Sequence, residues 1–474
     1  MAVGEIAEPV DLLVVGAGPG GYVAALRAAE LGRKVTLVDR DGKEGGTGGV
    51  CLRVGCIPSK ALIELAERCY QADGLRRFGV KNDNSAIDLP AFQEWKESIV
   101  ERLSAAVDRL LAQQAVRRLS GDLRFVRLDR AAVAHEDGAS TFLEFSQAVV
   151  ATGSRPRALP HLPFDGVRVV SSSEILGSTS IPPSVAVVGA GYIGLELGTA
   201  LAKLGSAVTV VEAEDRVLPG LDRSVARPIA RRLAELGITL ALSAEAVDLD
   251  DHDLCVRDPS GERRVPADKV LVAVGRVPNT DDLGLGHLGV DVGPEGLIRV
   301  DGGRMASPTV AAIGDVTSGP ALAHKASAEA RVAAERLCGL PALFDPMAIP
   351  VVVFTDPEVA VAGLSESEAR AEGMDVAVSA VPVSATGRAL ILGGTDGSTR
   401  LVVDRATDRV VGAQLVGPHA SELIAEVGLA IEMTASPLDV AETVHAHPTL
   451  SESVQLAARA LVRTETNNPK GDPG

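Results

Sequence analysis

The sequence predicts an α/β fold that contains two copies of one strand-helix-strand unit and ends in an α+β segment. An internal repeat is the first reason, since residues 12–39 and 185–212 match at a constant offset of 173. Each copy has an apolar strand, a glycine turn, an Ala/Leu-rich helix and a second apolar strand that ends in an acid. The second reason is a C-terminal run of strands from 349 to 416, followed by helices near 419–433 and 449–463.

Length, charge and cysteine content limit the protein class. A chain of 474 residues is too long for one ordinary core, so we expect domains of roughly 100 to 200 residues. The net charge of -17 repels phosphate backbones and anionic lipid, so we expect no nucleic-acid and no membrane partner. Acids near the start argue against a leader peptide, and five scattered cysteines do not form a secreted disulfide framework. We therefore expect a cytoplasmic protein.

Each copy of the repeat carries the pattern G-x-G-x-x-G between its first strand and its helix. The first glycine permits a tight turn, the second lets a pyrophosphate approach the backbone, and the third lets the helix pack on the strand. The helix N-terminus then faces the negative charge of the ligand. The six glycines are Gly16, Gly18 and Gly21 in the first copy and Gly189, Gly191 and Gly194 in the second. Two Rossmann-like dinucleotide-binding domains are predicted.

An acid ends the second strand of each copy. Asp39 and Glu212 each lie 23 residues after the first glycine of their motif. At this place a carboxylate accepts hydrogen bonds from ribose hydroxyls and repels a 2'-phosphate. The alternative, two ligand-free helix starts, is disfavoured because the strand, turn, helix and acid recur together.

Cys51 and Cys56 are the candidate reactive residues. Pro58 is typical of a first helical turn, which places Cys56 at a helix N-terminus, where the helix field stabilises a thiolate. A zinc site would need further N or S ligands, and no second Cys or His pair lies nearby in the sequence, so we expect no metal. Two reduced core thiols remain the alternative.

Other segments are predicted from periodicity and breaker residues. Residues 89–119 have amphipathic spacing and should form one long helix. A breaker cluster at 274–279 marks the exit of the second unit, and a strand at 310–313 ends just before Asp315. The polar tail should be loose.

The segment GGVCLRVGCIPSKAL resembles the redox-active disulfide segment of the pyridine nucleotide-disulfide oxidoreductases, and of their dihydrolipoamide-oxidising branch in particular. Matching motifs cover nearly the whole chain. They are GAGPGGY at 16, ATGSRP at 151, GAGYIGLELG at 189, GRVPNT at 275, IGDV at 313, LAHKA at 322, FTDPEVA at 354 and HAHPTLSE at 445.

The resemblance implies a domain order and a homodimer. It gives an FAD-binding domain with the redox disulfide, an NAD-binding domain, a central segment that completes the FAD site, a dimerisation domain and a flexible tail. The corresponding residues are 1–155, 156–278, 279–345, 346–463 and 464–474.

The resemblance also implies roles for single residues. Cys56 would face the flavin and Cys51 would meet the substrate, while Lys60 would pair with Glu196. Arg53 stands where the family usually has Asn, and this difference bears on the redox balance between the disulfide and its reduced form. The implied FAD contacts are Gly16, Gly18, Gly21, Asp39, Lys60, Gly121, Thr152, Gly153, Ser154, Asp315, which would hold the ribityl chain, Ala321, Leu322, Ala323 and His324. The implied NAD contacts are Gly189, Gly191, Gly194, Glu196, Glu212 and Gly275.

His447 and Glu452 would supply the proton chemistry. Taken alone, two histidines in a polar turn are more often solvated loop residues. The resemblance instead makes His447 the base that deprotonates a dithiol, oriented by Glu452, with His445 as a neighbour. The implied activity is NAD+-dependent oxidation of dihydrolipoamide carried by lipoyl domains of acyltransferases or glycine-cleavage carriers.

Rival functions share the predicted fold. Glutathione-type reductases use NADPH and would need Arg in place of Glu212. Mercuric reductases add a C-terminal cysteine pair, and no cysteine follows Cys338. Soluble transhydrogenases lack one of the two redox cysteines. A non-catalytic scaffold in a multienzyme complex is the alternative outside enzymes, and the intact set of cysteines, His447 and Glu452 argues against it.

Overall fold

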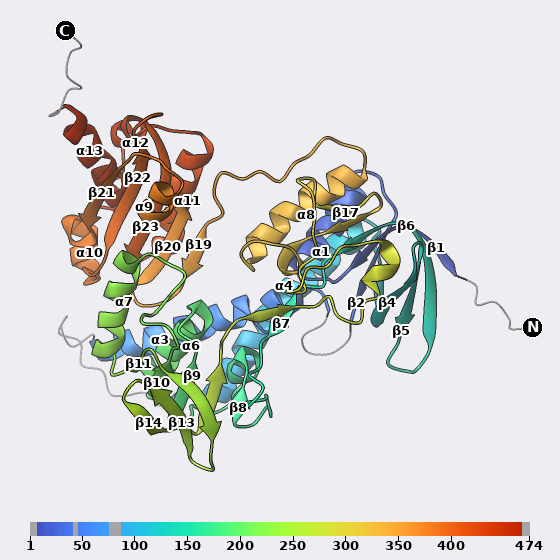
Figure 1. Ribbon diagram of the computed structural model, residues 1–474, viewed down its shortest axis with the longest axis horizontal. Coiled ribbons are helices and arrows are strands. Elements are labelled where there is room, and N and C mark those ends of the chain that lie inside the picture. Colours follow the sequence, from blue (N-terminus) through green and yellow to red (C-terminus); the bar gives the residue numbers. More distant parts are fainter. Residues whose placement is uncertain (1–6, 41–45, 75–86, 467–474) are drawn as a thin grey trace, which may run out of the picture.

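The computed structural model describes residues 7–40, 46–74 and 87–466. Three large sheets dominate it: an eight-stranded mixed sheet, a five-stranded parallel sheet and a five-stranded antiparallel sheet. In Figure 1 the mixed sheet lies at the right, the parallel sheet at the bottom and the antiparallel C-terminal sheet at the upper left. The predicted fold class is confirmed: two α/β units built on parallel strands and an α+β segment.

The eight-stranded sheet carries the first copy of the repeat. Its main path runs β17-β18-β6-β1-β2-β3, and β4 and β5 extend it as a hairpin beside β6. The inner strand β1 is a nearly continuous apolar run because both faces of the sheet are covered. The strands are β1 (Glu8–Val15), β2 (Val35–Asp39), β3 (Arg117–Ser120), β4 (Asp122–Arg127), β5 (Arg130–Ala134), β6 (Ser140–Val150), β17 (Met305–Ser307) and β18 (Val310–Ala312).

Different elements cover the two faces of this sheet. Helices α1 (Pro19–Glu30) and α8 (Ala323–Leu337) pack together on one face, where their alanines allow a close approach. The other face is covered by the β4-β5 hairpin and the short helix η2 (Leu285–Leu288). Since α8, β17 and β18 follow the second unit in the sequence, the first sheet is completed only when the chain returns from it.

The parallel sheet has the order β11-β10-β9-β15-β8. Helix α6 (Tyr192–Lys203) follows β9, and α7 (Arg223–Glu235) follows β10. The antiparallel pair β7 (Ser154–Pro156) and β16 (Arg276–Pro278) forms where the chain leaves the first sheet and returns to it. The strands of the parallel sheet are β8 (Val169–Val170), β9 (Ser184–Val188), β10 (Ala207–Val211), β11 (Thr239–Ala241) and β15 (Lys269–Val272). A separate three-stranded antiparallel sheet contains β12 (Glu245–Leu249), β13 (Asp253–Asp258) and β14 (Gly261–Pro266).

The C-terminal sheet has the order β19-β20-β23-β22-β21, and all its pairs are antiparallel. Helices α11 (Ala420–Glu432) and α13 (Glu452–Thr466) pack on it through a core of Val, Ala, Leu and Ile. All five strands predicted here are present: β19 (Val351–Val353), β20 (Glu358–Gly363), β21 (Val376–Pro382), β22 (Ser398–Asp404) and β23 (Arg409–Gly417).

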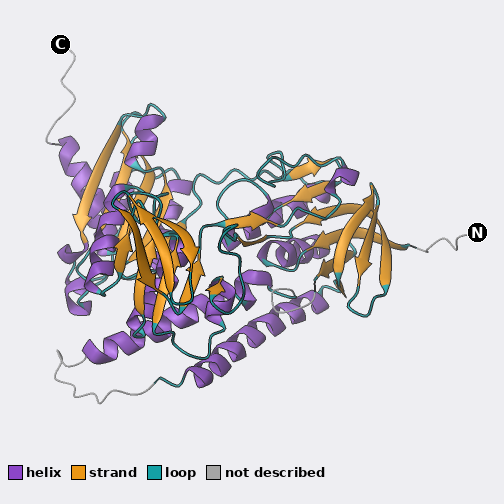
Figure 2. Ribbon diagram, turned by 60° about the horizontal axis from the view of Figure 1, so that its bottom comes forward, coloured by secondary structure: helices purple, strands orange, loops and turns teal. Residues whose placement is uncertain are grey.

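Two long helices, α3 (Cys56–Gly74) and α4 (Leu89–Gln113), lie together along one side of the molecule (Figure 2). The prediction of one helix over 89–119 was wrong at its C-terminal end. Ala115 has a left-handed backbone with φ 53°, which ends the helix, and the chain then enters β3. Helical spacing continued across this turn because buried Val116 and half-buried Leu119 lie three residues apart in the sequence.

Short helices escaped the sequence prediction because they offer too few turns for a helical period. They are α2 (Gly49–Arg53), α5 (Ser172–Leu176), α9 (Glu366–Ala371), α10 (Gly387–Leu392) and α12 (Pro437–Glu442).

The predicted loose tail was too long, since residues 464–466 continue α13 and the rest lie outside the described residues. The proposed domain limits stay predictions, and the one at 155 falls inside β7. Within residues 7–40, 46–74 and 87–466, no helix has both the length and the apolar character that a membrane crossing requires.

Candidate active site

The turn between β1 and α1 is open toward a ligand. Gly18 is the N-cap of α1, no side chain caps the helix, and a Cβ built on Gly18 meets no heavy atom within 4 Å. A Cβ on Gly21 would instead lie 1.7 Å from the carbonyl oxygen of Gly16. The backbone N–H groups at the helix start are therefore accessible, and the residues present fit a pyrophosphate.

The turn between β9 and α6 repeats this geometry. Gly191 is an N-cap without a side-chain cap and has open space around its Cβ position. A Cβ on Gly194 would lie 2.1 Å from the carbonyl oxygen of Gly189. The two copies of the motif thus share one division of labour, with an open middle glycine and a third glycine in tight packing.

The acid of each copy lies beside its glycine turn. The Asp39 carboxylate accepts a hydrogen bond from the Gly46 N–H at 2.7 Å, and burial raises the pKa of Asp39 to about 6 despite such bonds. The Glu212 carboxylate accepts from the Ala190 N–H at 2.7 Å and from the Glu214 N–H at 2.9 Å. Both carboxylates are fixed at the place where a ribose would lie.

A first cleft joins the first glycine turn to the cysteines. The volume of this cleft, including its opening to solvent, is about 1340 Å³. Most predicted FAD contacts line it, together with one residue predicted on the NAD side. These lining residues are Gly16, Gly18, Asp39, Cys51, Cys56, Lys60, Thr152, Gly153, Ser154, Asp315, Ala321, Ala323 and Glu196.

Four residues predicted as FAD contacts do not line this cleft. Gly21 packs against Gly16, and Gly121 donates its N–H to the Asp39 carbonyl, behind the carboxylate, at 2.9 Å. Leu322 is the N-cap of α8, and the His324 ring bonds the Pro350 carbonyl at 2.8 Å. Leu322 and His324 lie beside the lining residues Ala321 and Ala323, and contact of these four residues with FAD stays a prediction.

A second cleft adjoins the first and follows the second copy of the motif. It is lined by Gly189, Gly191, Glu212 and Gly275 among the predicted NAD contacts, but not by Gly194 or Glu196. Tyr192, Asp315 and Ala321 line both clefts, so the two open onto each other. A nicotinamide entering along the second motif would therefore reach the first cleft.

Cys51 and Cys56 lie together on the wall of the first cleft. Cys51 belongs to α2, Cys56 begins α3, and both are free thiols in the structure. The hydrogen bond between the two sulfurs, with Lys60 nearby, lowers the pKa of Cys56 to about 7, although burial opposes this. The same hydrogen bond and burial raise the pKa of Cys51. The pair is thus polarised, with Cys56 as the thiolate and Cys51 as the proton donor.

Lys60 connects the cysteines to α6. Its ammonium donates to Glu196 Oε2 at 2.7 Å, which is the predicted pairing. Sequence reasoning did not single out Phe354, whose N–H donates to Glu196 Oε1 at 2.9 Å and whose ring lies 4.5 Å from Lys60 Nζ. The FTDPEVA motif contains this residue, but the motif itself does not reveal what it contacts.

Asp315 lies where the two clefts meet. Its carboxylate accepts from the Ser154 hydroxyl at 2.5 Å, and Arg276 lies 3.9 Å from it. Arg276 also donates to the Ser154 hydroxyl and carbonyl at 2.6 Å each. Arg276 was missed because only the β7-β16 pairing brings position 276 to position 154.

His447 and Glu452 form a pair at the start of α13. The Nδ1 atom of His447 lies 2.9 Å from Glu452 Oε1, and the Thr449 N–H donates to Oε2 at 2.9 Å. The His447 bond, followed by the Thr449 bond, lowers the pKa of Glu452. The His447 side chain is 77% exposed and lines neither cleft of its own chain. Within one chain, His447, the predicted base, therefore does not share a cleft with the cysteines.

Two family models match the chain in succession. The model of the pyridine nucleotide-disulphide oxidoreductases matches residues 10–330, and that of their dimerisation domain matches residues 349–458. The chain belongs to the pyridine nucleotide-disulphide oxidoreductase family. FAD and NAD are the cofactors of this family, as expected from the sequence.

Relatives cover the chain almost completely. It is 46% identical to the dihydrolipoyl dehydrogenase of Geobacillus stearothermophilus over 469 residues, which is 98% of each chain. It is also 46% identical to dihydrolipoyl dehydrogenase 2 of Haloarcula marismortui, over 97% of this chain and 98% of that one. Among solved structures, LpdA from Mycobacterium tuberculosis superposes with a TM-score of 0.88 at 29% identity, covering 95% of this chain and all of that one.

Two substitutions should separate packing from ligand binding at the second glycine turn. Gly194→Ala forces a methyl group against the Gly189 carbonyl and should destabilise the protein by about 3 kcal/mol. Gly191→Ala meets no atom and should change the stability by no more than about 1 kcal/mol, but the methyl group should raise the KM for NAD+. Thermal unfolding and steady-state kinetics measure both effects. Equal stability of the two variants would contradict this division.

Proposed function

We propose that this family member is a dihydrolipoyl dehydrogenase, which oxidises protein-bound dihydrolipoamide to lipoamide with NAD+ as the acceptor. The observation that carries the proposal is the polarised pair Cys51 and Cys56 on the cleft wall, with Cys56 as the thiolate. The overall reaction converts one dithiol and NAD+ into one disulfide, NADH and a proton.

The chain's own residues supply the thiol chemistry. His447 keeps its Nδ1 atom on Glu452, which leaves Nε2 to take a proton from a substrate thiol. The substrate thiolate attacks Cys51 of an oxidised Cys51-Cys56 pair, the bond between the two sulfurs breaks, and Cys56 leaves as the thiolate. The second substrate thiol then displaces Cys51, which yields lipoamide and leaves both cysteines reduced.

The two clefts supply the cofactor sites. The first glycine turn, Asp39, Asp315 and Lys60 would hold FAD, and the second glycine turn with Glu212 would hold NAD. These residues would hold FAD between the cysteine pair and NAD+, where it would supply the two-electron chemistry that connects them.

We further propose that the working protein is a homodimer with shared active sites. The His447-Glu452 pair belongs to the segment that matches the dimerisation domain, is exposed, and lines neither cleft of its own chain. A two-fold dimer would bring this pair to the cysteines of the partner subunit twice. In the same proposal lipoyl domains of acyltransferases or glycine-cleavage carriers deliver the dithiol, and five scattered cysteines fit a reducing cytoplasm.

An NADPH-dependent reductase of glutathione or mercuric type is the second candidate. The backbone bonds on Glu212 disfavour it, because they hold a carboxylate where a 2'-phosphate would need a cation. Arg216 does not relieve this, since its guanidinium donates to the Pro219 carbonyl at 2.8 Å and contacts Asp215.

The nucleotide preference tests the role of Glu212. The wild-type protein should have a much higher kcat/KM for NAD+ than for NADP+. Glu212→Gln removes the charge and should narrow the ratio by about tenfold, which corresponds to about 1.4 kcal/mol. Glu214→Gln is the matched control, because this side chain is exposed and does not line the cleft. Comparable values for the two nucleotides in the wild type would refute the assignment.

Absorption spectra of the holoprotein test which cysteine is the thiolate. Cys51→Ser should show a long-wavelength thiolate-flavin band without reduction, and the band should fade on acidification, because Cys56 then takes up a proton. Cys56→Ser should lack the band, and Cys69→Ser, further along α3, should behave as the wild type. A band in Cys56→Ser and none in Cys51→Ser would reverse the assignment.

Complementation tests the shared site. Subunits with Cys51→Ser and subunits with His447→Gln should each be nearly inactive alone. Each mixed dimer contains one doubly damaged and one intact site, and random reassortment makes half of the dimers mixed. Roughly a quarter of the wild-type activity should therefore return after co-refolding. If mass spectrometry finds mixed dimers and no activity returns, the base and the cysteines act within one chain.

A further inference from the structure

Helices α3 and α6 are joined by two ion pairs that lie one heptad apart. The first is Lys60 on α3 with Glu196 on α6. The second is Glu67 on α3 with Lys203 on α6, seven residues further along both helices. The helices therefore run parallel, and the polarity reverses from one pair to the next. Only the first pair lines the cleft with the cysteines.

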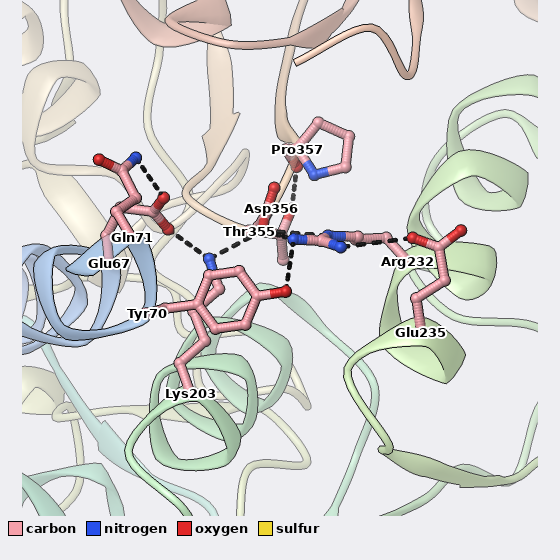
Figure 3. A network of polar contacts seen from close by, with 9 residues as sticks. All are labelled: Glu67, Tyr70, Gln71, Lys203, Arg232, Glu235, Thr355, Asp356 and Pro357. Carbon is pink, nitrogen blue, oxygen red and sulfur yellow. Dashed lines mark hydrogen bonds and ion pairs between the residues drawn. The ribbon is translucent and has the colours of Figure 1, made fainter. Parts of the chain in front are cut away.

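A short segment of the C-terminal part of the chain bonds both pairs. Phe354 donates its N–H to Glu196 and stacks its ring near Lys60. Two residues later, Asp356 accepts from Lys203 at 2.8 Å. Residues 354–356 thus bridge α3 and α6 from a third element, the connection between β19 and β20. Figure 3 shows the part of this bridge around Asp356.

Asp356 is the centre of the second group. Arg232 on α7 donates to its carboxylate from Nε at 3.1 Å and from a terminal nitrogen at 2.8 Å. The Tyr70 ring lies 5.2 Å from the Lys203 ammonium and 5.5 Å from the Arg232 guanidinium (Figure 3). Although burial opposes it, Lys203 and Arg232 hold the pKa of Asp356 below its usual value. The Asp356 carboxylate is therefore ionised and forms ion pairs with both cations.

Burial makes this group more consequential than a surface ion pair. The Lys203 side chain is 4% exposed, and those of Arg232 and Asp356 are 21% and 30% exposed. Removing one partner of a largely buried pair leaves a charge unpaired, and the neighbouring groups must move to solvate it. Around Asp356 those groups lie on α6 and α7 and, through Glu67, on α3, the helix that begins with Cys56.

We propose that Asp356 is a positioning residue for the Cys56 thiolate, acting through Lys203 and through Phe354. It fixes α3 against α6 at the second ion pair and holds the Phe354 N–H on Glu196 at the first. Lys60 is then kept at the distance from which it lowers the pKa of Cys56. The inference rests on the proposed function and adds a link from the C-terminal part of the chain to the redox pair.

The sign of the pKa change distinguishes positioning from simple charge removal. Asp356→Asn deletes a negative charge, and by direct electrostatics this would lower the pKa of Cys56 or leave it unchanged. If Asp356 positions Lys60, its loss lets Lys60 move away, and the pKa of Cys56 rises. If Asp356 only stabilises the fold, its loss lowers the thermal stability and leaves the pKa of Cys56 unchanged.

The experiment is a pH titration of the thiolate-flavin band in the holoprotein, on the Cys51→Ser background. We expect Asp356→Asn to raise the midpoint by about half a pH unit or more, and Asp356→Glu to restore part of the shift. Glu67→Gln removes the other carboxylate on Lys203 and should shift the midpoint in the same direction. It carries the test if Asp356→Asn does not retain FAD.

Asp396→Asn is the matched control. Asp396 pairs with Arg231, the neighbour of Arg232 on α7, but forms no hydrogen bond or ion pair with α3 within the described part of the chain. It should leave the midpoint unchanged. An unchanged or lowered midpoint in both Asp356→Asn and Glu67→Gln overturns the inference. Absence of any band in the Cys51→Ser parent would count against the proposed function instead, so the two failures are distinguishable.

Discussion

The close approach of backbone to backbone at Gly16 is the constraint on which the first site depends. A Cβ at this position would lie 2.3 Å from the Ala151 carbonyl oxygen, so β1 and the end of β6 meet without any side chain between them. This contact sets the turn into α1 and brings residues 151–154 alongside it. Gly189 repeats the arrangement against the Ala273 carbonyl, at 2.6 Å. The same contact between a glycine and a backbone carbonyl therefore lies at the base of both clefts.

The cysteines gain their polarity from charges placed on both sides of Cys56. The hydrogen bond from Cys51 favours the Cys56 thiolate most, and the Lys60 ammonium and the start of α3 add to it, while burial and Glu196 oppose it. Glu196 also binds Lys60 and the Phe354 N–H. Its negative charge is therefore largely compensated, which limits its effect on the Cys56 sulfur. The net effect is a lowered pKa for Cys56, so a movement of Lys60 changes the thiolate population.

Sequence reasoning found what depends on local pattern and missed what depends on tertiary contact. The glycine turns, the strands that end in Asp39 and Glu212, and the helix start at Cys56 all carry short-range signals. Helix α2, which contains Cys51, was missed because five residues are too few to show a helical period.

Arg276, Phe354 and Asp356 were missed for a different reason. Each reaches its partners only because strands distant in the sequence pair or because a third element docks onto α3 and α6. Leu322 and His324 were assigned from the family motif alone, and the structure places them beside the first cleft, outside its lining. Motifs thus identified the neighbourhood of the site more reliably than the individual contacts.

The exposure of His447 has a physical consequence for how the site is assembled. A solvent-exposed pair such as His447 and Glu452 contributes only about 0 to 1 kcal/mol by itself, because water screens it. The Thr449 N–H and the start of α13 therefore hold Glu452 in place, and Glu452 fixes the ring. Such a pair becomes an effective base only where a second surface excludes water around Nε2. The same C-terminal part of the chain that exposes His447 also packs residues 354–356 against α3 and α6, where they contact Glu196, Lys60 and Lys203 of their own chain.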